Sequence, residues 1–327
     1  MAQLSIVSGK GGVGKTTLAA ALASRYAVAG QRTVLVSLEN SNRRHPVFGL
    51  PFGYEGVAVP GFDGALMLVR IEAMASVREY VRRKLPLGRL YQSAFNSRAF
   101  RDFAAAAPGF EELMVLGKLH DLITAAPYDQ VIFDAPATGH LRQLLKVPRA
   151  TQQAVRFGPL FDIARKIERR LTNAQQSRLL LPSLCEEMPL RESAELAEFT
   201  VKELGLPTQL LLNRIEHTTL TAALLDELEQ LAAVDPQLVP TLLQCRRAEA
   251  RARSAEALCA AAAMLHPRLP TLLESALRLP VLRPAVEAQQ PSGDDWAFRF
   301  AQSVTAGLAR QLEPLVTGWT PAAVATE

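Results

Sequence analysis

The sequence contains only three cysteines among its 327 residues, and these are Cys185, Cys245 and Cys259. They lie far apart, and no two have the C-x-x-C spacing that is typical of zinc and redox sites. We therefore expect reduced thiols that pack as small hydrophobic side chains. A metalloid site assembled from cysteines that are distant in sequence is the alternative.

Long apolar runs and a strong excess of one charge are also missing. No stretch reaches the roughly eighteen apolar residues that a membrane-spanning helix needs, and the first residues predict a strand and not the apolar segment of a signal peptide. We expect a cytoplasmic protein without a transmembrane segment. The net charge of +4 is modest, and basic residues are spread among 32 acidic ones, so no nucleic-acid partner is expected.

A glycine-rich loop organises the chain. Residues 9–17 read GKGGVGKTT, which matches the phosphate-loop pattern G-x-x-x-x-G-K-[ST]. An apolar run at 4–7 predicts a strand before the loop, and an Ala- and Leu-rich stretch at 17–26 predicts a helix after it. Strand, loop and helix are the context in which this motif binds a nucleotide polyphosphate.

The residue types of the loop explain this chemistry. Glycines leave backbone N–H groups bare around phosphate oxygens, and the helix N-terminus adds a favourable field. Lys15 neutralises the β- and γ-phosphates, the Thr16 hydroxyl binds Mg²⁺, and Thr17 reaches the α-phosphate. The loop residues expected to bind MgATP are Gly11, Gly12, Val13, Gly14, Lys15, Thr16 and Thr17.

Lys10 is a second lysine, and the phosphates do not need it, because Lys15 already serves them. The stretch KGGVGKTT resembles the deviant Walker A signature of the dimeric ATPases that include MinD, ParA, the nitrogenase iron protein and the ArsA arsenite-pump ATPase. This resemblance implies a homodimer in which Lys10 acts catalytically on the nucleotide of the partner subunit.

Two further carboxylates are predicted near the phosphates. Residues 33–37 predict a buried strand, and Glu39 follows its carboxyl end, the edge where open α/β sheets bind ligands. We expect Glu39 to orient or deprotonate an attacking water, and a solvated carboxylate at the strand end is the alternative. Residues 130–134 form an apolar run that ends in Asp134, as a Walker B strand does, so Asp134 would hold Mg²⁺ through a water. The loop at 135–140 can sense the γ-phosphate.

The periodicity of the remaining chain favours helices. Helical patterns occupy 73–84, 97–106, 109–125 and 190–204, and residues 208–214 predict another buried strand. We predict one α/β phosphate-loop NTPase domain over residues 1–327, with a mainly parallel sheet flanked by helices. A helical subdomain would be inserted at about 65–127 and 147–176.

A second stretch narrows the family. Residues 133–148, FDAPATGHLRQLLKVP, closely resemble the DTAPTGHTLRxL segment of ArsA and of the ATPases that target tail-anchored proteins. Residues 108–112 and 185–192 resemble the PGxxE and PExxPxxET segments of the same family. In this family the asparagine that closes the strand at 208–214 reads adenine, which implies that role for Asn213; a helix-capping asparagine is the alternative. The family's zinc-binding C-x-x-C is replaced by Cys245-Arg246-Arg247-Ala248, so we expect no zinc.

The resemblance implies a homodimeric ATPase that binds and hydrolyses MgATP, similar to the arsenite-pump ATPases. Two other functions stay open: a switch that acts on a membrane-protein or tail-anchored client, and a nucleotide-binding module that does not hydrolyse ATP. One departure bears on hydrolysis. Glu39 stands where the family has a water-activating aspartate, and its extra methylene shifts the carboxylate by more than about 1 Å, which is enough to slow catalysis.

Overall fold

The structure, a computed structural model, describes residues 2–38, 44–84, 109–215, 222–247, 249–250, 269–274, 276–280, 312 and 315–316. Within these residues eight strands form one sheet in the order β3-β4-β2-β5-β1-β6-β7-β8. All neighbouring pairs are parallel except β3 with β4. The strands are β1 (Gln3–Val7), β2 (Thr33–Leu38), β3 (Val57–Ala58), β4 (Leu66–Ile71), β5 (Gln130–Asp134), β6 (Ser177–Ser183), β7 (Thr208–Ile215) and β8 (Leu277–Pro280).

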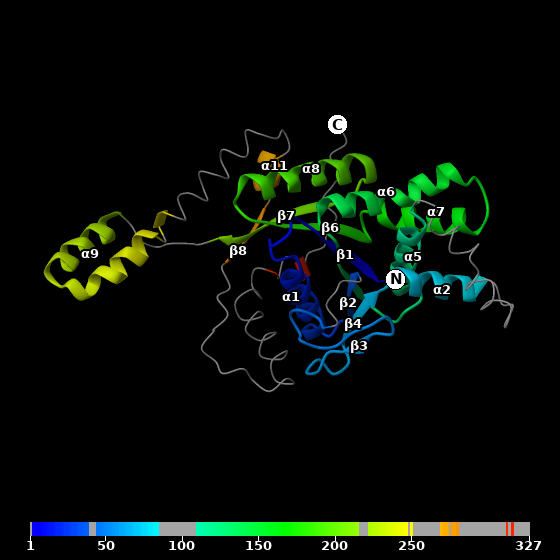
Figure 1. Cartoon of the computed structure of the whole chain (residues 1–327), viewed down its shortest axis with the longest axis horizontal. Helices are drawn as coiled ribbons and strands as arrows, with labels where there is room; N and C mark the ends of the chain where they lie inside the picture. The colour runs from blue at the N-terminus through cyan, green and yellow to red at the C-terminus, as the bar shows by residue number, and fades with distance from the viewer. Residues whose placement is uncertain are drawn as a thin grey trace.

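Helices pack on both faces of this sheet, so its central strands are short apolar runs. In β1 the side chains alternate: Ile6 packs in the core under α5, α6 and α8, whereas Val7 packs in the core under α1. Figure 1 shows α1 on one side of the sheet and α6 and α8 on the other. The described helices are α1 (Lys15–Val28), α2 (Ala73–Lys84), α5 (Phe110–Thr124), α6 (Thr138–Ala154), α7 (Pro159–Leu171), α8 (Glu187–Leu204), α9 (Ala222–Val234) and α11 (Leu269–Glu274), with the 3-10 helix η1 (Pro236–Leu238).

The strand order brings distant chain segments to one edge of the sheet. After β1 the chain adds β2, β4 and β5 on one side of β1. After β5 it crosses to the other side of β1, where it adds β6, β7 and β8. Val7 at the end of β1 is in register with Asp134 at the end of β5, and Ser37 of β2 is in register with Asp134 from the other side. A crevice outside the carboxyl ends of strands, at such a switch in direction, is where α/β sheets bind ligands.

The predicted α/β fold with a mainly parallel sheet is confirmed. The strand at 130–134 is β5, the helix at 73–84 is α2, and the helix predicted at 109–125 spans 110–124. The segment 65–127 was predicted to be helical, but it begins with strand β4. The apolar run of β4 is buried, and its backbone pairs with β2 in the sheet. The helix predicted at 97–106 lies outside the described residues. The assignment of the whole chain to one domain stays a prediction.

Candidate nucleotide site

The glycine loop joins β1 to α1, and three of its glycines are required by geometry. Gly12 and Gly14 have φ angles of 84° and 94°, in the left-handed region that favours glycine, and Gly14 is the N-cap of α1. A Cβ atom at Gly9 would lie 2.5 Å from the carbonyl oxygen of Pro182 on β6. The loop therefore runs closely between β6 and the first turn of α1, and its path delivers Lys15 and Thr16 to the start of the helix.

Asn213 at the end of β7 holds this loop. Its Nδ2 donates a hydrogen bond of 2.8 Å to the carbonyl oxygen of Val13, and its Oδ1 accepts one of 2.9 Å from the backbone N–H of Arg214. A Cβ atom at Gly14 would lie 2.5 Å from the same Nδ2. A primary amide has two N–H donors and two acceptor lone pairs, so one of each remains beyond these two bonds. Asn213 thus lies at the predicted nucleotide site, and its contact with adenine stays a prediction.

Thr16 and Asp134 meet across the crevice. The Thr16 hydroxyl donates a hydrogen bond of 2.8 Å to Oδ2 of Asp134. Burial raises the pKa of Asp134 to about 6, although the Thr16 hydrogen bond and the positive charge of Lys15 both act to lower it. Because burial destabilises the charged form of this carboxylate, a cation placed beside it would stabilise that form.

Lys15 lies in the same part of the site. Its Nζ donates to the carbonyl oxygen of Lys10, 3.0 Å away, which places the ammonium group against the loop. Burial lowers the pKa of Lys15, while the negative charges of Asp134 and Glu192 act to raise it. The described structure therefore places a partly buried cation beside a hydroxyl and a carboxylate.

Lys10 is bound by a residue that the sequence did not single out. Glu192 on α8 accepts a hydrogen bond of 2.9 Å from Lys10 Nζ through Oε1, and one of 3.0 Å from the Thr138 hydroxyl through Oε2. Burial alone would raise the pKa of Glu192, but these hydrogen bonds, with the charges of Lys10 and Lys15, lower it. Glu192 closes the stretch 185–192 that resembles a family segment, so the signal was present without a role attached to it.

The loop after β5 is tied to the phosphate loop in a second place. Ser8 directly precedes the glycine loop, and its hydroxyl donates 2.7 Å to the carbonyl oxygen of Pro136. Thr138, two residues later, begins α6 and contacts Glu192. The loop predicted to sense the γ-phosphate thus has contacts to the strand before the phosphate loop and to α8.

Glu39, the predicted water-orienting carboxylate, lies outside the described residues, so its role stays a prediction. Cys185 and Cys245 are reduced cysteines of intermediate exposure, and Cys259 lies outside the described part of the chain. The described residues contain no cluster of three or more His, Cys, Asp or Glu side chains that could hold a metal ion. Among the same residues, no helix has the length and apolar character to cross a membrane.

The donors present at the loop suit Mg²⁺. This ion prefers hard oxygen ligands, keeps several waters, and is bound by one or two protein oxygens together with substrate phosphates. The paired Thr16 hydroxyl and Asp134 carboxylate, 2.8 Å apart, supply such oxygens. The site therefore fits a divalent cation that arrives with a nucleotide.

Comparison with known proteins gives a consistent result. The model of a family described as anion-transporting ATPases matches residues 2–176. ATPase BagA of Mycobacterium tuberculosis is 28 % identical over 211 residues, which cover 60 % of this chain and 60 % of that protein. ATPase get3 of Schizosaccharomyces japonicus is 31 % identical over 166 residues, 48 % of this chain and 49 % of that protein, and ATPase GET3 of Malassezia globosa is 30 % identical over 176 residues, 51 % of each.

The matched region contains the phosphate loop, Asp134 and Thr138. It ends before Glu192 and Asn213, so the placement of these two residues at the site rests on the structure. The chain spans between about half and three-fifths of the length of these three relatives.

Proposed function

The chain belongs to the anion-transporting ATPase family, and on that basis we propose that it binds MgATP in the crevice beside β1 and β5 and hydrolyses it. The observation that carries the proposal is the Thr16–Asp134 hydrogen bond of 2.8 Å at the start of α1, with Lys15 beside it. A hydroxyl, a carboxylate and an ammonium group in this arrangement match the needs of a polyphosphate with its Mg²⁺.

Each residue of this cradle has a defined task in the proposal. Lys15 neutralises the β- and γ-phosphates, and the bare N–H groups of Gly12 to Thr17 donate hydrogen bonds to the phosphate oxygens. Thr16 and Asp134 hold Mg²⁺, which when bound neutralises charge that develops on the phosphates. Asn213 positions the loop and presents its remaining N–H and lone pair to adenine.

We assign water activation to Glu39, the residue that comes next in the sequence after β2. Phosphoryl transfer asks little of the protein beyond positioning and charge stabilisation, so a carboxylate that orients the water contributes mainly through geometry. The glutamate, in place of the aspartate of related ATPases, predicts slow hydrolysis.

We further propose that two chains pair, and that Lys10 then acts on the nucleotide of the partner subunit. In the described structure Lys10 is paired with Glu192 of its own chain, with side-chain exposures of 34 % and 30 %. An ion pair this exposed contributes at most about 1 kcal/mol, so a phosphate can displace the carboxylate at small cost. Glu192 also accepts a hydrogen bond from Thr138 at the start of α6, which links this ion pair to the loop after β5.

Binding of MgATP is tested with Lys15→Ala. Loss of a charge-assisted contact of about 1.5–3 kcal/mol predicts a Kd that rises roughly tenfold to a hundredfold. Lys202→Ala is the matched control, because Lys202 pairs with Glu198 on the exposed face of α8. Fluorescent-nucleotide titration that gave equal Kd values for Lys15→Ala and the parent protein would rule out the proposed site.

Action in trans is tested by mixing Lys10→Ala with Glu39→Gln. Each variant alone should turn over poorly, whereas the mixed dimer contains one site with its own Glu39 and the partner's Lys10. Steady-state ATPase activity should therefore be partly restored on mixing. Two variants that stay inactive together would place Lys10 in its own subunit's site, and ATP binding without turnover in the parent protein would favour the non-hydrolysing module.

A switch acting on a protein client is the second candidate, favoured by one observation. The segment 222–247 lies apart from the helices that cover the sheet, and α9 is seen beyond β8 (Figure 1). It exposes large apolar side chains, with exposed fractions of 57 % at Leu231, 86 % at Val234 and 49 % at Leu243. Gathered apolar exposure of this kind marks interaction surfaces more often than scattered single residues do.

Two assays separate the client switch from a metalloid-coupled ATPase acting in the cytoplasm. A synthetic transmembrane peptide should bind the parent protein in a nucleotide-dependent way, and Leu231→Lys with Val234→Lys should abolish that binding if the client function holds. Arsenite or antimonite should instead stimulate the ATPase rate if the metalloid function holds, and Cys185→Ser should reduce the stimulation.

A further inference from the structure

The connection between α6 and α7 presents a phenylalanine to solvent. Phe157 is 84 % exposed, and Arg156 beside it is exposed as well. Figure 1 shows this connection at the outer end of the α6–α7 pair, away from the sheet. A single exposed apolar side chain is common on protein surfaces and indicates nothing alone. Its meaning here depends on the backbone and the charges around it.

The backbone of the connection holds Phe157 outside both helices. Helix α6 ends at Ala154, and its C-cap Val155 is extended, with φ −123° and ψ 110°. Gly158 has a φ of 101°, which favours glycine, and Pro159 begins α7. Apart from Phe157 and Pro159, no heavy atom would lie within 4 Å of a Cβ atom at Gly158. The turn therefore projects from the packed helices into open space.

One face of α7 is basic. Its exposed charged side chains, spaced as on one side of a helix, are Asp162, Arg165, Lys166 and Arg169. The side chains that pack in the core from the opposite face are Ala164, Ile167 and Leu171. Residues 155–169 contain four basic and two acidic side chains, so this segment carries a net charge of +2. The turn and the exposed face of α7 therefore attract anions.

The acidic side chains of α7 leave two of these cations unpaired. Asp162 pairs with Arg165 at an N–O distance of 3.6 Å, and both side chains are exposed. Glu168 is half-buried and accepts a hydrogen bond from α6. Within the part of the chain that the structure describes, Arg156 and Arg169 form no ion pair. These two guanidinium groups can therefore meet an external anion without breaking an ion pair.

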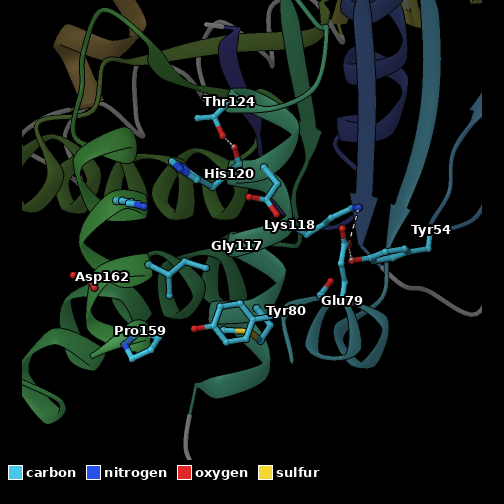
Figure 2. A pocket seen from close by; sticks show the side chains of 14 residues that line it. Tyr54, Glu79, Tyr80, Gly117, Lys118, His120, Thr124, Pro159 and Asp162 are labelled. Carbon is cyan, nitrogen blue, oxygen red and sulfur yellow. Dashed lines mark hydrogen bonds and ion pairs between the residues drawn. The ribbon is translucent and has the colours of Figure 1, made fainter. Parts of the chain in front are cut away.

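Lys166 contributes to this face only in part. Figure 2 shows Asp162 of α7 beside a cavity of about 340 Å³ that α2 and α5 also line. Lys166 lines the same cavity, and so does the acidic Asp121 on α5, which offsets part of the Lys166 charge. Arg156 and Arg169 do not line the cavity, and both are exposed. An external anionic partner would therefore depend most on these two arginines.

An anionic lipid surface matches this combination of features. Lipid phosphates provide negative charge over a flat area, and the boundary beneath them accepts an aromatic side chain. A projecting turn can enter such a surface, whereas an acidic protein segment would bind the cations and leave the Phe157 ring in water. Each basic residue held near an anionic membrane strengthens binding by about fivefold. The exposed phenylalanine therefore favours the lipid over the acidic protein segment.

We propose that the α6–α7 turn docks the protein on an anionic lipid surface. Phe157 enters the headgroup region, and Arg156 and the basic face of α7 lie against the lipid phosphates. Docking is weak and reversible, because one aromatic side chain and a small net charge give far less binding than a covalent lipid anchor with a polybasic segment. Docking does not depend on the proposed ATPase function, since none of these residues is assigned to the nucleotide site.

Co-sedimentation of the nucleotide-free full chain with lipid vesicles tests the partner. The probes are vesicles of phosphatidylcholine alone and vesicles in which about 30 % of it is replaced by phosphatidylglycerol, an anionic lipid. Binding to the anionic vesicles should be at least about tenfold stronger, and it should weaken when salt is raised from about 0.05 to 0.3 M. Absence of binding to the anionic vesicles, or equal binding to both, overturns the proposal.

Substitutions test the location. Phe157→Ser, and separately Arg156→Gln combined with Arg169→Gln, should each weaken binding to anionic vesicles by about tenfold or more. The matched control is Arg191→Gln combined with Lys202→Gln, which removes the same charge from exposed positions on α8 and should bind as tightly as the parent protein. All five residues are exposed, so the fold should be retained. An equal loss in the control would assign binding to the total charge of the protein and overturn the proposal.

An acidic peptide separates the other kind of partner. Full affinity of Phe157→Ser for anionic vesicles overturns the lipid proposal, and tight binding of a glutamate-rich peptide to the parent protein would then identify an acidic protein segment as the partner. The affinity for MgATP should be unchanged in Phe157→Ser. Failure of the lipid proposal would therefore leave the proposed ATPase site unaffected.

Discussion

Asn213 is predicted to serve two functions with one amide group, and these can be separated by substitution. In the first, Nδ2 holds the phosphate loop through the Val13 carbonyl oxygen at 2.8 Å, and Oδ1 fixes the backbone N–H of Arg214 at 2.9 Å. In the second, the remaining N–H and the remaining lone pair form hydrogen bonds with adenine, which presents an adjacent acceptor and donor. Loss of the first function affects every nucleotide, whereas loss of the second affects only adenine nucleotides.

The magnitudes follow from counting bonds. Asn213→Ala removes one hydrogen bond to the loop and one to Arg214, each with a net contribution of about 1 kcal/mol. The phosphate loop then loses its support, and the affinities for ATP and GTP should both fall by roughly tenfold. Two lost adenine bonds add about 1–3 kcal/mol for ATP alone, so the ratio of ATP to GTP affinity should fall by a further factor of about ten.

The assay is competition of ATP and of GTP against one fluorescent nucleotide, on the parent protein and on Asn213→Ala. Asn213→Asp is the second variant, because it keeps the acceptor for Arg214 and loses the donor to Val13. Both variants should lose preference for ATP. If ATP and GTP lose affinity by the same factor in Asn213→Ala, the amide only supports the loop, and the adenine assignment is wrong.

Three further predictions concern the loop, the Lys10 pair and pH. Gly14→Ala should lower the free energy of unfolding, measured in urea, by about 2 kcal/mol, because alanine is strained at φ 94° and its Cβ meets Asn213. The loss should be smaller when Gly14→Ala is combined with Asn213→Ala, and additive losses of the two substitutions would contradict the clash. Glu192→Gln should strengthen nucleotide-dependent pairing up to about fivefold in sedimentation, because Lys10 is released from a partly exposed ion pair; weaker pairing would assign Glu192 a positioning role. Burial lowers the pKa of His45 to about 4, so between pH 6.5 and 4 the unfolded state binds a proton that the folded state does not, and the free energy of unfolding falls by up to about 3 kcal/mol. His45→Asn should flatten this part of the plot of unfolding free energy against pH, and parallel plots for the two proteins would show that His45 is not responsible.

The local parts of the site could be predicted because their geometry depends on neighbouring residues. Glycine at 12 and 14 permits the left-handed backbone of the loop, and the strand and helix on either side follow from apolar runs and helical periodicity. Asp134 was predictable for the same reason, as the polar end of an apolar run in a fold whose strand ends share one edge. The predicted α/β fold is confirmed, and the structure brings Thr16, Lys15 and Asp134 together, whereas their roles in nucleotide binding stay predictions.

The structure adds a contact to each of two residues that the sequence named, and their predicted roles stay predictions. Lys10 was expected to act on a partner subunit, and within one chain its ammonium group is held by Glu192. Asn213 was expected at the base, and its amide already supports the phosphate loop. In both cases the residue type was informative, but the contact of each side chain depends on which segment packs beside it.

What only the tertiary structure decided is the set of contacts between residues far apart in the chain. Glu192 lies 182 positions from Lys10, and Asn213 lies 200 positions from Val13, so no periodicity or motif links them. They meet because β6 and β7 follow β1 in the sheet and α8 packs over the same face as α6. Sequence spacing sets which face a side chain takes on its own helix, and only the packing of one helix against another sets what that face contacts.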